Sequence, residues 1–361
     1  MRKMNFIIAA AIAAGAVIAC TDKGQTDIPV NDWPWGDNQE EVTPPDTPDT
    51  PVTPEPPAEP NQGYVDAGWT NVGTQFGELP EGINVYKSPA KLQDKAAIAY
   101  IAVADLSKAD WDVWSVKADD NYKTNDSYRT PSKVYEAGEW PIIINGGYFY
   151  YSGGNYTSSL AVSGGEVLAY NINYASEDWV SIYNPTRAAF LEKKDGTFDA
   201  CWTYWTGSKH YTYQVPAENS YDEAPKQTPS ATYPEKAVEF AAETAIGGGP
   251  VLINAGEIAN TWKEEMFDVG GVNPTSNNPR TAIGVTADNK LIFFVCEGRN
   301  QTEGVAGMTT ENVANVLLDL GCVEAMNLDG GGSSCMLVNG QETIKVSDGS
   351  QRAVASTVMM K

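Results

Sequence analysis

Asp329 stands at the centre of the residues in this chain that could do chemistry. It follows the apolar run 323–328, which predicts a buried strand. Five small residues come directly after it: Gly330, Gly331, Gly332, Ser333 and Ser334. Because glycine tolerates positive φ and lets a ligand approach the backbone, this segment predicts a turn that faces a bound molecule. The alternative is a plain hairpin turn, since Asp-Gly is a common turn pair.

A second carboxylate, Glu297, follows another apolar run, 291–296. Two carboxylates at strand ends could lie on one edge of a sheet. There they could work as an acid and base pair, or as a nucleophile and its partner. We therefore take Asp329 and Glu297 as the candidate catalytic residues.

Three arginines fall at predicted strand ends or turns in the last quarter of the chain: Arg280, Arg299 and Arg352. Their placement is notable because the chain has a formal net charge of -23. A guanidinium group is a planar fork that suits carboxylate or phosphate, so these arginines are candidate anion-binding residues. The alternative for each is an ion pair with a neighbouring acid.

Glycine clusters meet two other predicted strands. Asn145 and Gly146 end the apolar run 141–144, and Gly249 precedes the run 251–253. These positions repeat the pattern at Asp329, so we take Asn145, Gly146 and Gly249 as candidate binding residues.

Composition excludes several classes of protein. The acidic charge argues against nucleic-acid binding, which needs a basic surface. His210 is the only histidine and lies in a polar segment, 208–234, predicted to be a surface insertion. No zinc spacing, phosphate loop or dinucleotide motif occurs, so the sequence predicts no metal and no cofactor. Four cysteines follow Cys20, and both free thiols and a disulfide remain open for them.

The elements that must position these residues are short strands and a few helices. Strands are predicted at 96–106, 111–116, 141–144, 159–162, 166–170, 187–191, 198–205 and 323–328, with a hairpin over 280–285 and 291–296. Helices are predicted at 131–137, 234–244 and 309–320. The last has Thr309 as its N-cap and Gly321 as its stop. The segment from Arg187 repeats the spacing of the segment from Arg280, so two similar hairpins are expected. The fold class is α+β, with a mixed, mostly antiparallel sheet in a single catalytic domain.

The first twenty residues predict export. A basic start is followed by the apolar run 6–19 and by Val17-Ile18-Ala19-Cys20, which resembles a bacterial lipobox. The predicted organisation is a signal peptide at 1–20, a proline-rich acidic spacer at 21–62 and a folded domain at 63–361. Lipidation of Cys20 would anchor the protein to the cell envelope, periplasmic or at the cell surface, without a membrane span. A simple secreted protein is the alternative.

Six motifs occur in a fixed order between about residues 142 and 357. They are Asn145-Gly-Gly-Tyr-Phe, Gly248-Gly-Pro-Val-Leu, Pro279-Arg-Thr-Ala-Ile-Gly, Glu297-Gly-Arg, Gly307-Met-Thr309 and Asn327-Leu-Asp-Gly-Gly-Gly-Ser-Ser. The set resembles the phosphodiester glycosidase family. This chain departs from the family pattern at Glu297, where Asp is usual, and at Asn312, where Glu is usual.

The resemblance implies hydrolysis of the C1–O bond of a sugar-1-phosphodiester, which releases the sugar and leaves a phosphomonoester. Asp329 and Glu297 would be catalytic, while Thr309 and the glycines, serines and arginines above would bind substrate. The expected partner is a carbohydrate or glycan phosphodiester. Two alternatives remain: a glycosidase for non-phosphorylated surface polysaccharide, and a non-catalytic carbohydrate-binding lipoprotein that uses aromatics such as Trp202 and Trp205.

Overall fold

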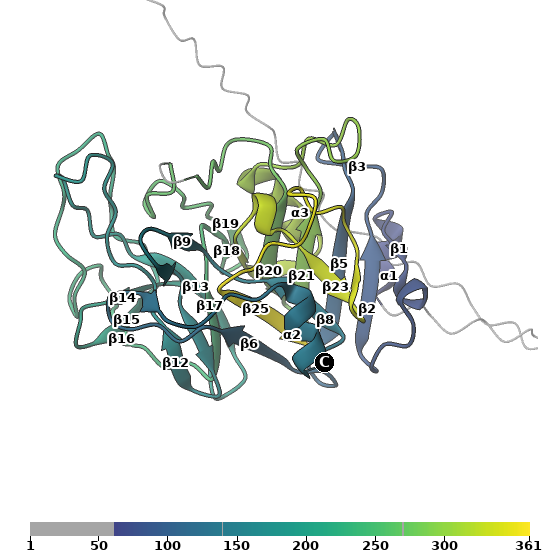
Figure 1. The fold of residues 1–361 in the computed structure, drawn as a ribbon, viewed down its shortest axis with the longest axis horizontal. Coiled ribbons are helices and arrows are strands. Elements are labelled where there is room, and N and C mark those ends of the chain that lie inside the picture. Colours follow the sequence, from purple (N-terminus) through teal and green to yellow (C-terminus); the bar gives the residue numbers. More distant parts are fainter. Residues whose placement is uncertain (1–60, 139, 269–270) are drawn as a thin grey trace, which may run out of the picture. The chain divides into compact units, whose positions relative to one another are not determined.

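The computed structural model describes residues 61–138, 140–268 and 271–361, all within one compact unit (Figure 1). The predicted signal peptide, the lipidation site Cys20 and the spacer up to residue 60 lie outside the described residues. Within them, no helix is long and apolar enough to cross a membrane.

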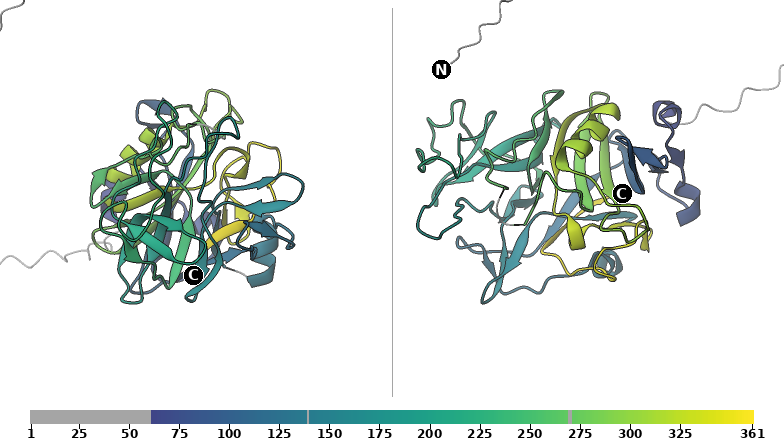
Figure 2. Two further views of the ribbon diagram at one scale, coloured as in Figure 1. Left: turned by 90° about the vertical axis from the view of Figure 1, so that its left-hand side faces the viewer. Right: turned by 90° about the horizontal axis from the view of Figure 1, so that it is seen from above.

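Two large sheets form most of the domain. The larger has eight strands in the order β1 (Thr70–Asn71), β2 (Ile83–Lys87), β5 (Ala99–Asp105), β21 (Lys290–Cys296), β20 (Arg280–Thr286), β22 (Cys322–Asn327), β18 (Val251–Asn254) and β19 (Glu257–Ile258). The second has seven, in the order β12 (Glu166–Ala169), β11 (Ala161–Ser163), β17 (Thr244–Gly247), β13 (Arg187–Glu192), β14 (Phe198–Trp205), β15 (His210–Tyr213) and β16 (Val238–Glu239). Figures 1 and 2 show the second sheet to one side of the first.

Three smaller sheets complete the strands. A five-stranded sheet runs β24 (Gln341–Glu342), β23 (Met336–Val338), β8 (Ile142–Asn145), β25 (Ser356–Met360) and β6 (Trp111–Ser115). The others are β7 (Lys123–Thr124), β10 (Asn155–Thr157) and β9 (Phe149–Tyr151), and the pair β3 (Lys91–Leu92) and β4 (Lys95–Ala96). Every strand pair among the described residues is antiparallel, so the predicted α+β fold with a mostly antiparallel sheet is confirmed.

The predicted hairpin at 280–296 is the centre of the large sheet. β20 and β21 are apolar on both faces because both faces are covered. Ile283 and Phe293 join one buried cluster, whereas Ala282 and Phe294 join another, which also contains the apolar face of α3 (Thr310–Asp319). Strands buried on both faces therefore appear in the sequence as continuous apolar runs.

Helices are few: α1 (Gln62–Asp66), α2 (Pro131–Gly138), α3, and the short 3-10 turns η1 (Gly73–Phe76) and η2 (Gly331–Ser333). α3 begins and ends as predicted. The Thr309 hydroxyl accepts a hydrogen bond from the Asn312 amide at 3.1 Å, and the Asn312 side chain accepts one from the Thr309 amide. Asn312 therefore completes a capping box although it is not the acid usual in the family.

The helix predicted at 234–244 is wrong. Residues 238–239 instead form β16, which pairs with β15, and β17 begins at Thr244. β15 in turn lies within the segment predicted as a surface insertion, and its ends, His210 and Tyr213, are buried. A polar segment here extends a sheet edge because Tyr and Thr alternate along β15 and fit a pleated surface.

The two similar hairpins predicted from the sequence are present. β13 pairs with β14 and β20 with β21, and each hairpin is flanked by a strand that leads into a glycine cluster. β17 leads into Gly247–Gly249, and β22 leads into Gly330–Gly332. Arg187 and Arg280 are the first residues of the two hairpins.

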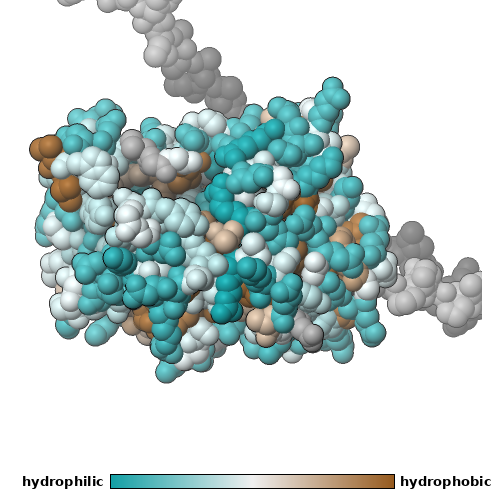
Figure 3. Space-filling model, viewed as in Figure 1, coloured by the Kyte–Doolittle hydropathy of each residue, from teal (hydrophilic) through white to brown (hydrophobic). Residues whose placement is uncertain are grey.

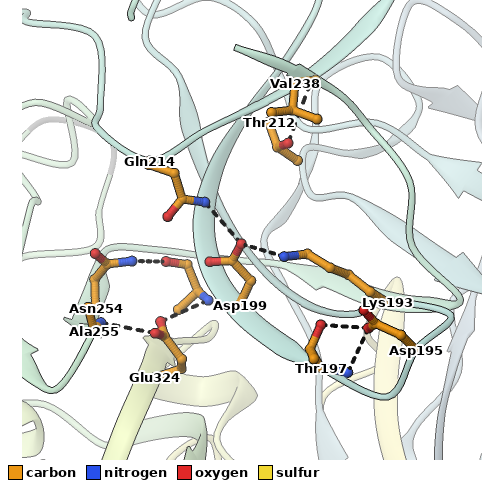
Figure 4. A network of polar contacts seen from close by, with 11 residues as sticks. Lys193, Asp195, Thr197, Asp199, Thr212, Gln214, Val238, Asn254, Ala255 and Glu324 are labelled. Carbon is orange, nitrogen blue, oxygen red and sulfur yellow. Dashed lines mark hydrogen bonds and ion pairs between the residues drawn. The ribbon is translucent and has the colours of Figure 1, made fainter. Parts of the chain in front are cut away.

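Hydrogen bonds to the carboxylate of Glu324 on β22 connect the two large sheets (Figure 4). One carboxylate oxygen accepts from the Ala200 amide on β14 at 3.0 Å, and the other accepts from the Ala255 amide at 2.9 Å. Asn254 also donates to the Ala200 carbonyl. Burial raises the pKa of Glu324 to about 7, against the two amides, which lower it.

Thr309 provides a test that separates folding from binding. Replacing it with Ala removes the cap acceptor and is expected to lower the free energy of unfolding by about 1 kcal/mol, measured by urea denaturation. Thr309→Ser keeps the hydroxyl and should retain most of the stability. If Thr309→Ala impairs ligand binding with unchanged unfolding, Thr309 is a binding residue and the cap is incidental.

Candidate active site

The glycine segment after Asp329 is not a hairpin turn. β22 belongs to the eight-stranded sheet and β23 to the five-stranded sheet, so residues 328–335 carry the chain from one to the other. Gly331 has φ +58. A Cβ at Gly331 would collide with the Arg299 guanidinium, and one at Gly332 with Arg352 and Asp348. The positive φ favours glycine at Gly331, and the absence of side chains at both positions lets the ends of two arginines lie directly against the backbone.

A cavity of about 650 Å³ opens beside this segment. Polar and backbone lining comes from Ser158, Arg187, Gly248, Gly271, Asn278, Arg280, Arg299, Asp329, Gly330, Gly331, Gly332 and Arg352. A volume of this size suits a small ligand of more than one ring. Asp329 is the one acid among the described residues that line the cavity, and four arginines line it with Asp329.

The Asp329 carboxylate is held by its own turn. It accepts hydrogen bonds from the Gly330 amide, at 2.9 Å, and from the Ser333 hydroxyl. Burial raises the pKa of Asp329 to about 6, while these hydrogen bonds and the charges of Arg352 and Arg299 lower it. A carboxyl group with such a pKa can exchange protons near neutral pH.

Arg299 and Arg352 flank the turn and share one counterion. Arg352 donates to the Asp348 carboxylate and to the Ser333 hydroxyl, and Arg299 lies 3.8 Å from the other Asp348 oxygen. Both side chains keep substantial exposure, at 47% for Arg299 and 39% for Arg352, so donors remain accessible from the cavity. One carboxylate between two arginines leaves a net positive charge beside Asp329.

Arg280 lies in the cavity wall but is not a free anion clamp. Its guanidinium donates to the backbone carbonyls of Met308, Val272, Asn273 and Ser276. Burial also lowers the pKa of Arg280. Four of its five N–H donors are therefore occupied, three by the 272–276 loop and one by Met308, so Arg280 contributes a positive charge to the site but has few donors left for an anion.

Arg187 was not among the predicted site residues. It is 7% exposed, stacks over Phe267 at 4.5 Å and lines the cavity. The sequence did contain one indication that Arg187 belongs to the site. Arg187 begins a hairpin that repeats the spacing of the hairpin that begins at Arg280.

Glu297, predicted to be catalytic, does not line the cavity. It is buried at the end of β21, where one carboxylate oxygen accepts from the Lys345 amide at 3.0 Å. That bond fixes the start of the segment that carries Asp348 and Arg352. Glu297 follows a strand as predicted, but its side chain points toward this neighbouring segment, and a strand end alone does not specify that direction.

Asn145 also lies behind the site rather than in it. The side chain is fully buried; its oxygen accepts from the Thr281 hydroxyl at 2.8 Å and the Cys335 amide at 3.1 Å. Its nitrogen donates to the Asp329 carbonyl at 2.7 Å. Asn145 therefore positions the backbone of Asp329.

The remaining predicted binding residues are divided between lining and support. Gly330, Gly331 and Gly332 line the cavity, but the amides of Gly330 and Gly331 already donate to Asp329 and to the Pro279 carbonyl. The predicted binding residues that do not line the cavity are Gly146, Gly249, Thr309, Ser333 and Ser334. Gly146 and Gly249 are sites of close backbone packing, since a Cβ would collide with Ser356 at the first and Phe267 at the second.

Aromatic and apolar side chains form the rest of the cavity wall. They are Tyr148, Phe149, Tyr150, Tyr151, Ile172, Tyr174, Met266, Phe267 and Val272. Such rings can stack on the faces of sugars. By contrast, Trp202 is buried in the core and Trp205 stacks on Tyr170 at 4.3 Å, so the aromatics proposed from the sequence as a sugar platform pack internally.

The described residues contain no group of three or more His, Cys, Asp or Glu side chains arranged to hold a metal ion. Cys201, Cys296, Cys322 and Cys335 are free and buried. The face of the protein in Figure 3 is largely hydrophilic with scattered hydrophobic patches.

Comparisons with known proteins agree with these motifs. The chain is 32% and 33% identical over 97 residues to the N-acetylglucosamine-1-phosphodiester alpha-N-acetylglucosaminidases of Bos taurus and Homo sapiens. It is 38% identical over 81 residues to the SPbeta prophage-derived uncharacterized protein YomE of Bacillus subtilis. The matches cover 22% to 26% of this chain but only 12% to 18% of these relatives.

Two solved structures share the fold. The catalytic domain of the zebrafish N-acetylglucosamine-1-phosphodiester alpha-N-acetylglucosaminidase has a TM-score of 0.50 and 20% identity, covering 77% of this chain and 82% of that one. A hypothetical protein from Synechocystis also has a TM-score of 0.50, with 15% identity, covering 78% of this chain and 62% of that one. The model of one family, described as phosphodiester glycosidase, matches residues 138–361, which include every lining residue of the cavity. The chain therefore belongs to the phosphodiester glycosidase family.

Proposed function

We propose that this protein hydrolyses the C1–O bond of a sugar-1-phosphodiester, releasing the sugar and leaving a phosphomonoester. The observation that carries the proposal is a single acid, Asp329, among arginines in a cavity with aromatic walls. Family membership supports it, as do the names of the cattle and human relatives.

The chemistry follows from the charges. Breaking the C1–O bond leaves negative charge on a phosphate oxygen, and the second ionisation of a phosphomonoester has a pKa of about 6, so this group leaves readily without a general acid. Arg299 and Arg352 stabilise the departing phosphate. Donors of this kind typically contribute on the order of 3 kcal/mol to lowering the barrier.

Asp329 acts on the sugar, at the carbon C1 where the bond breaks. A water molecule forms the new bond to C1 and gives its proton to the Asp329 carboxylate as the phosphate leaves. The ionised carboxylate also stabilises the positive charge that develops on the sugar ring. No second carboxylate among the described residues lines the cavity, so Asp329 carries this role alone.

Export and lipid anchoring at Cys20 are also part of the proposal. They rest on the sequence of the first twenty residues, and they would place the cavity in the periplasm or at the cell surface.

One assay tests the reaction. The purified protein is incubated with an N-acetylglucosamine-1-phosphodiester and, separately, with an aryl glycoside of the same sugar. We expect equal amounts of free sugar and phosphomonoester from the diester and little product from the glycoside. Equal turnover of both substrates would favour the non-phosphorylated alternative, and turnover of neither alongside glycan binding would favour a binding protein.

Asp329→Asn tests the base. We expect kcat/KM of the wild type to rise with pH through about 6 and the variant to lose activity by roughly 10³-fold or more.

The raised pKa means that the folded state binds a proton more tightly than the unfolded state, so ionisation of Asp329 destabilises the fold as pH rises from about 4 to above 6. The Asn variant lacks this penalty, so its melting temperature at pH 8 should be no lower than that of the wild type. A variant that is inactive and also less stable at pH 8 would contradict this assignment.

Arg352→Gln tests the phosphate side and its link to Asp329. We expect kcat/KM for the diester to fall by about 10²-fold. Because the charge of Arg352 lowers the pKa of Asp329, the acid limb of the pH profile should also move to higher pH. Arg129→Gln is the matched control, since Arg129 stacks on Trp114 and does not line the cavity. An unchanged acid limb would show that Arg352 does not act on Asp329.

A further inference from the structure

The cavity has a second cationic centre, at Arg187. Arg299 and Arg352 share Asp348 beside the turn that carries Asp329, whereas Arg187 rests on the Phe267 ring at 4.5 Å. The Tyr148 ring lies 5.3 Å from that of Phe267, and its hydroxyl donates to the carbonyls of Gly249 and Leu328, so Tyr148 connects the Arg187 side of the cavity wall to the segment that leads into Asp329.

Arg187 is buried without a carboxylate partner. Its Nη1 donates to the backbone carbonyl of Glu265, and its face rests on Phe267. Its Nε is buried and makes no hydrogen bond within the described residues, and the guanidinium forms no ion pair with any of them. A buried charge without a counterion is strongly unfavourable unless something else satisfies it.

The nearest acid does not fill that role. The Glu265 carboxylate is fully buried and accepts hydrogen bonds from four groups: the Ala188 amide, the Val251 amide, the Thr261 hydroxyl and the Trp202 indole. Through the Ala188 and Val251 amides, the Glu265 carboxylate connects β13 to β18. Burial raises the pKa of Glu265 to about 7, against its hydrogen bonds and the charge of Arg187, which lower it.

We propose that Arg187 binds a second anionic group of the substrate, a carboxylate or a phosphate distinct from the phosphodiester that is cleaved. This inference rests on the proposed function for the position of the scissile bond. The second anion belongs either to the sugar, as in a uronic acid, or to the alcohol side, as in the next unit of a phosphate-linked polymer. In both cases the guanidinium, held flat by Phe267, presents its unpaired donors to an oxyanion.

Binding to an inactive variant tests the inference without turnover. In the Asp329→Asn background, calorimetry measures the affinity of three probes. The first is N-acetylglucosamine 1-(methyl phosphate), with one negative charge; the second is its uronic acid counterpart; the third is an N-acetylglucosamine-1-phosphodiester whose alcohol carries a terminal phosphate. We expect one of the two probes with a second anion to bind at least about tenfold more tightly than the first.

The difference in affinity between the singly and doubly charged probes is called the margin. Substitutions at Arg187 then test whether this residue causes it. Arg187→Met should remove it, whereas Arg187→Lys, which keeps the charge without the fork, should retain part of it. Arg129→Met is the matched control, because Arg129 also stacks on an aromatic ring but lies away from the cavity, and it should leave the margin unchanged. Thermal unfolding of each variant shows whether the fold is kept.

The result that overturns the inference is equal affinity for all three probes, no measurable binding of any probe, or a loss in Arg187→Met that is the same for all three. The inference and the reaction can fail separately. If the wild type cleaves the singly charged diester and no margin is found, only the role of Arg187 fails. If a margin is found but no diester is cleaved, only the proposed reaction fails.

Discussion

The buried side chain of Asn145 is the interaction on which the site depends. It extends from β8 of the five-stranded sheet and bonds to Thr281 on β20 of the eight-stranded sheet, to the Cys335 amide and to the Asp329 carbonyl. A fully buried amide must satisfy its donors and acceptors within the protein, so only one arrangement of these segments is favourable. The position of Asp329 is therefore set by the junction of two sheets as well as by the turn in which it lies.

The electrostatics of the cavity depend on close backbone packing. This acidic protein lines one cavity with four of its arginines, and two of them, Arg299 and Arg352, approach Asp329 because the turn beneath them has no side chains. Each arginine is held differently. Arg280 is fixed by backbone carbonyls, Arg299 and Arg352 share Asp348, and Arg187 rests on an aromatic ring. The positive field is consequently built into rigid elements before any substrate arrives.

Local signals in the sequence predicted much of this structure. The α3 cap and its glycine stop, the 280–296 hairpin and the strand before Asp329 each depend on a few adjacent residues, and each appears as predicted. The 234–244 helix failed because its residues complete a sheet edge formed by a distant strand. Asp329, Arg299 and Arg352 line the cavity, but Glu297 and Asn145 turn toward neighbouring segments. Sequence spacing identifies a strand end, yet which way its side chain points is decided by tertiary packing.

The paired hairpins at Arg187 and Arg280 give the cavity two halves of similar architecture and different content. The half that contains Asp329 is constrained by many mutually dependent bonds, so most changes there would disable it. Arg187 is held by the Glu265 carbonyl and the Phe267 ring, and neither takes part in the hydrogen bonds that fix Asp329. Evolution can therefore alter the second half with the first intact, and descendants of one ancestral protein could come to accept different polymers while keeping a common reaction.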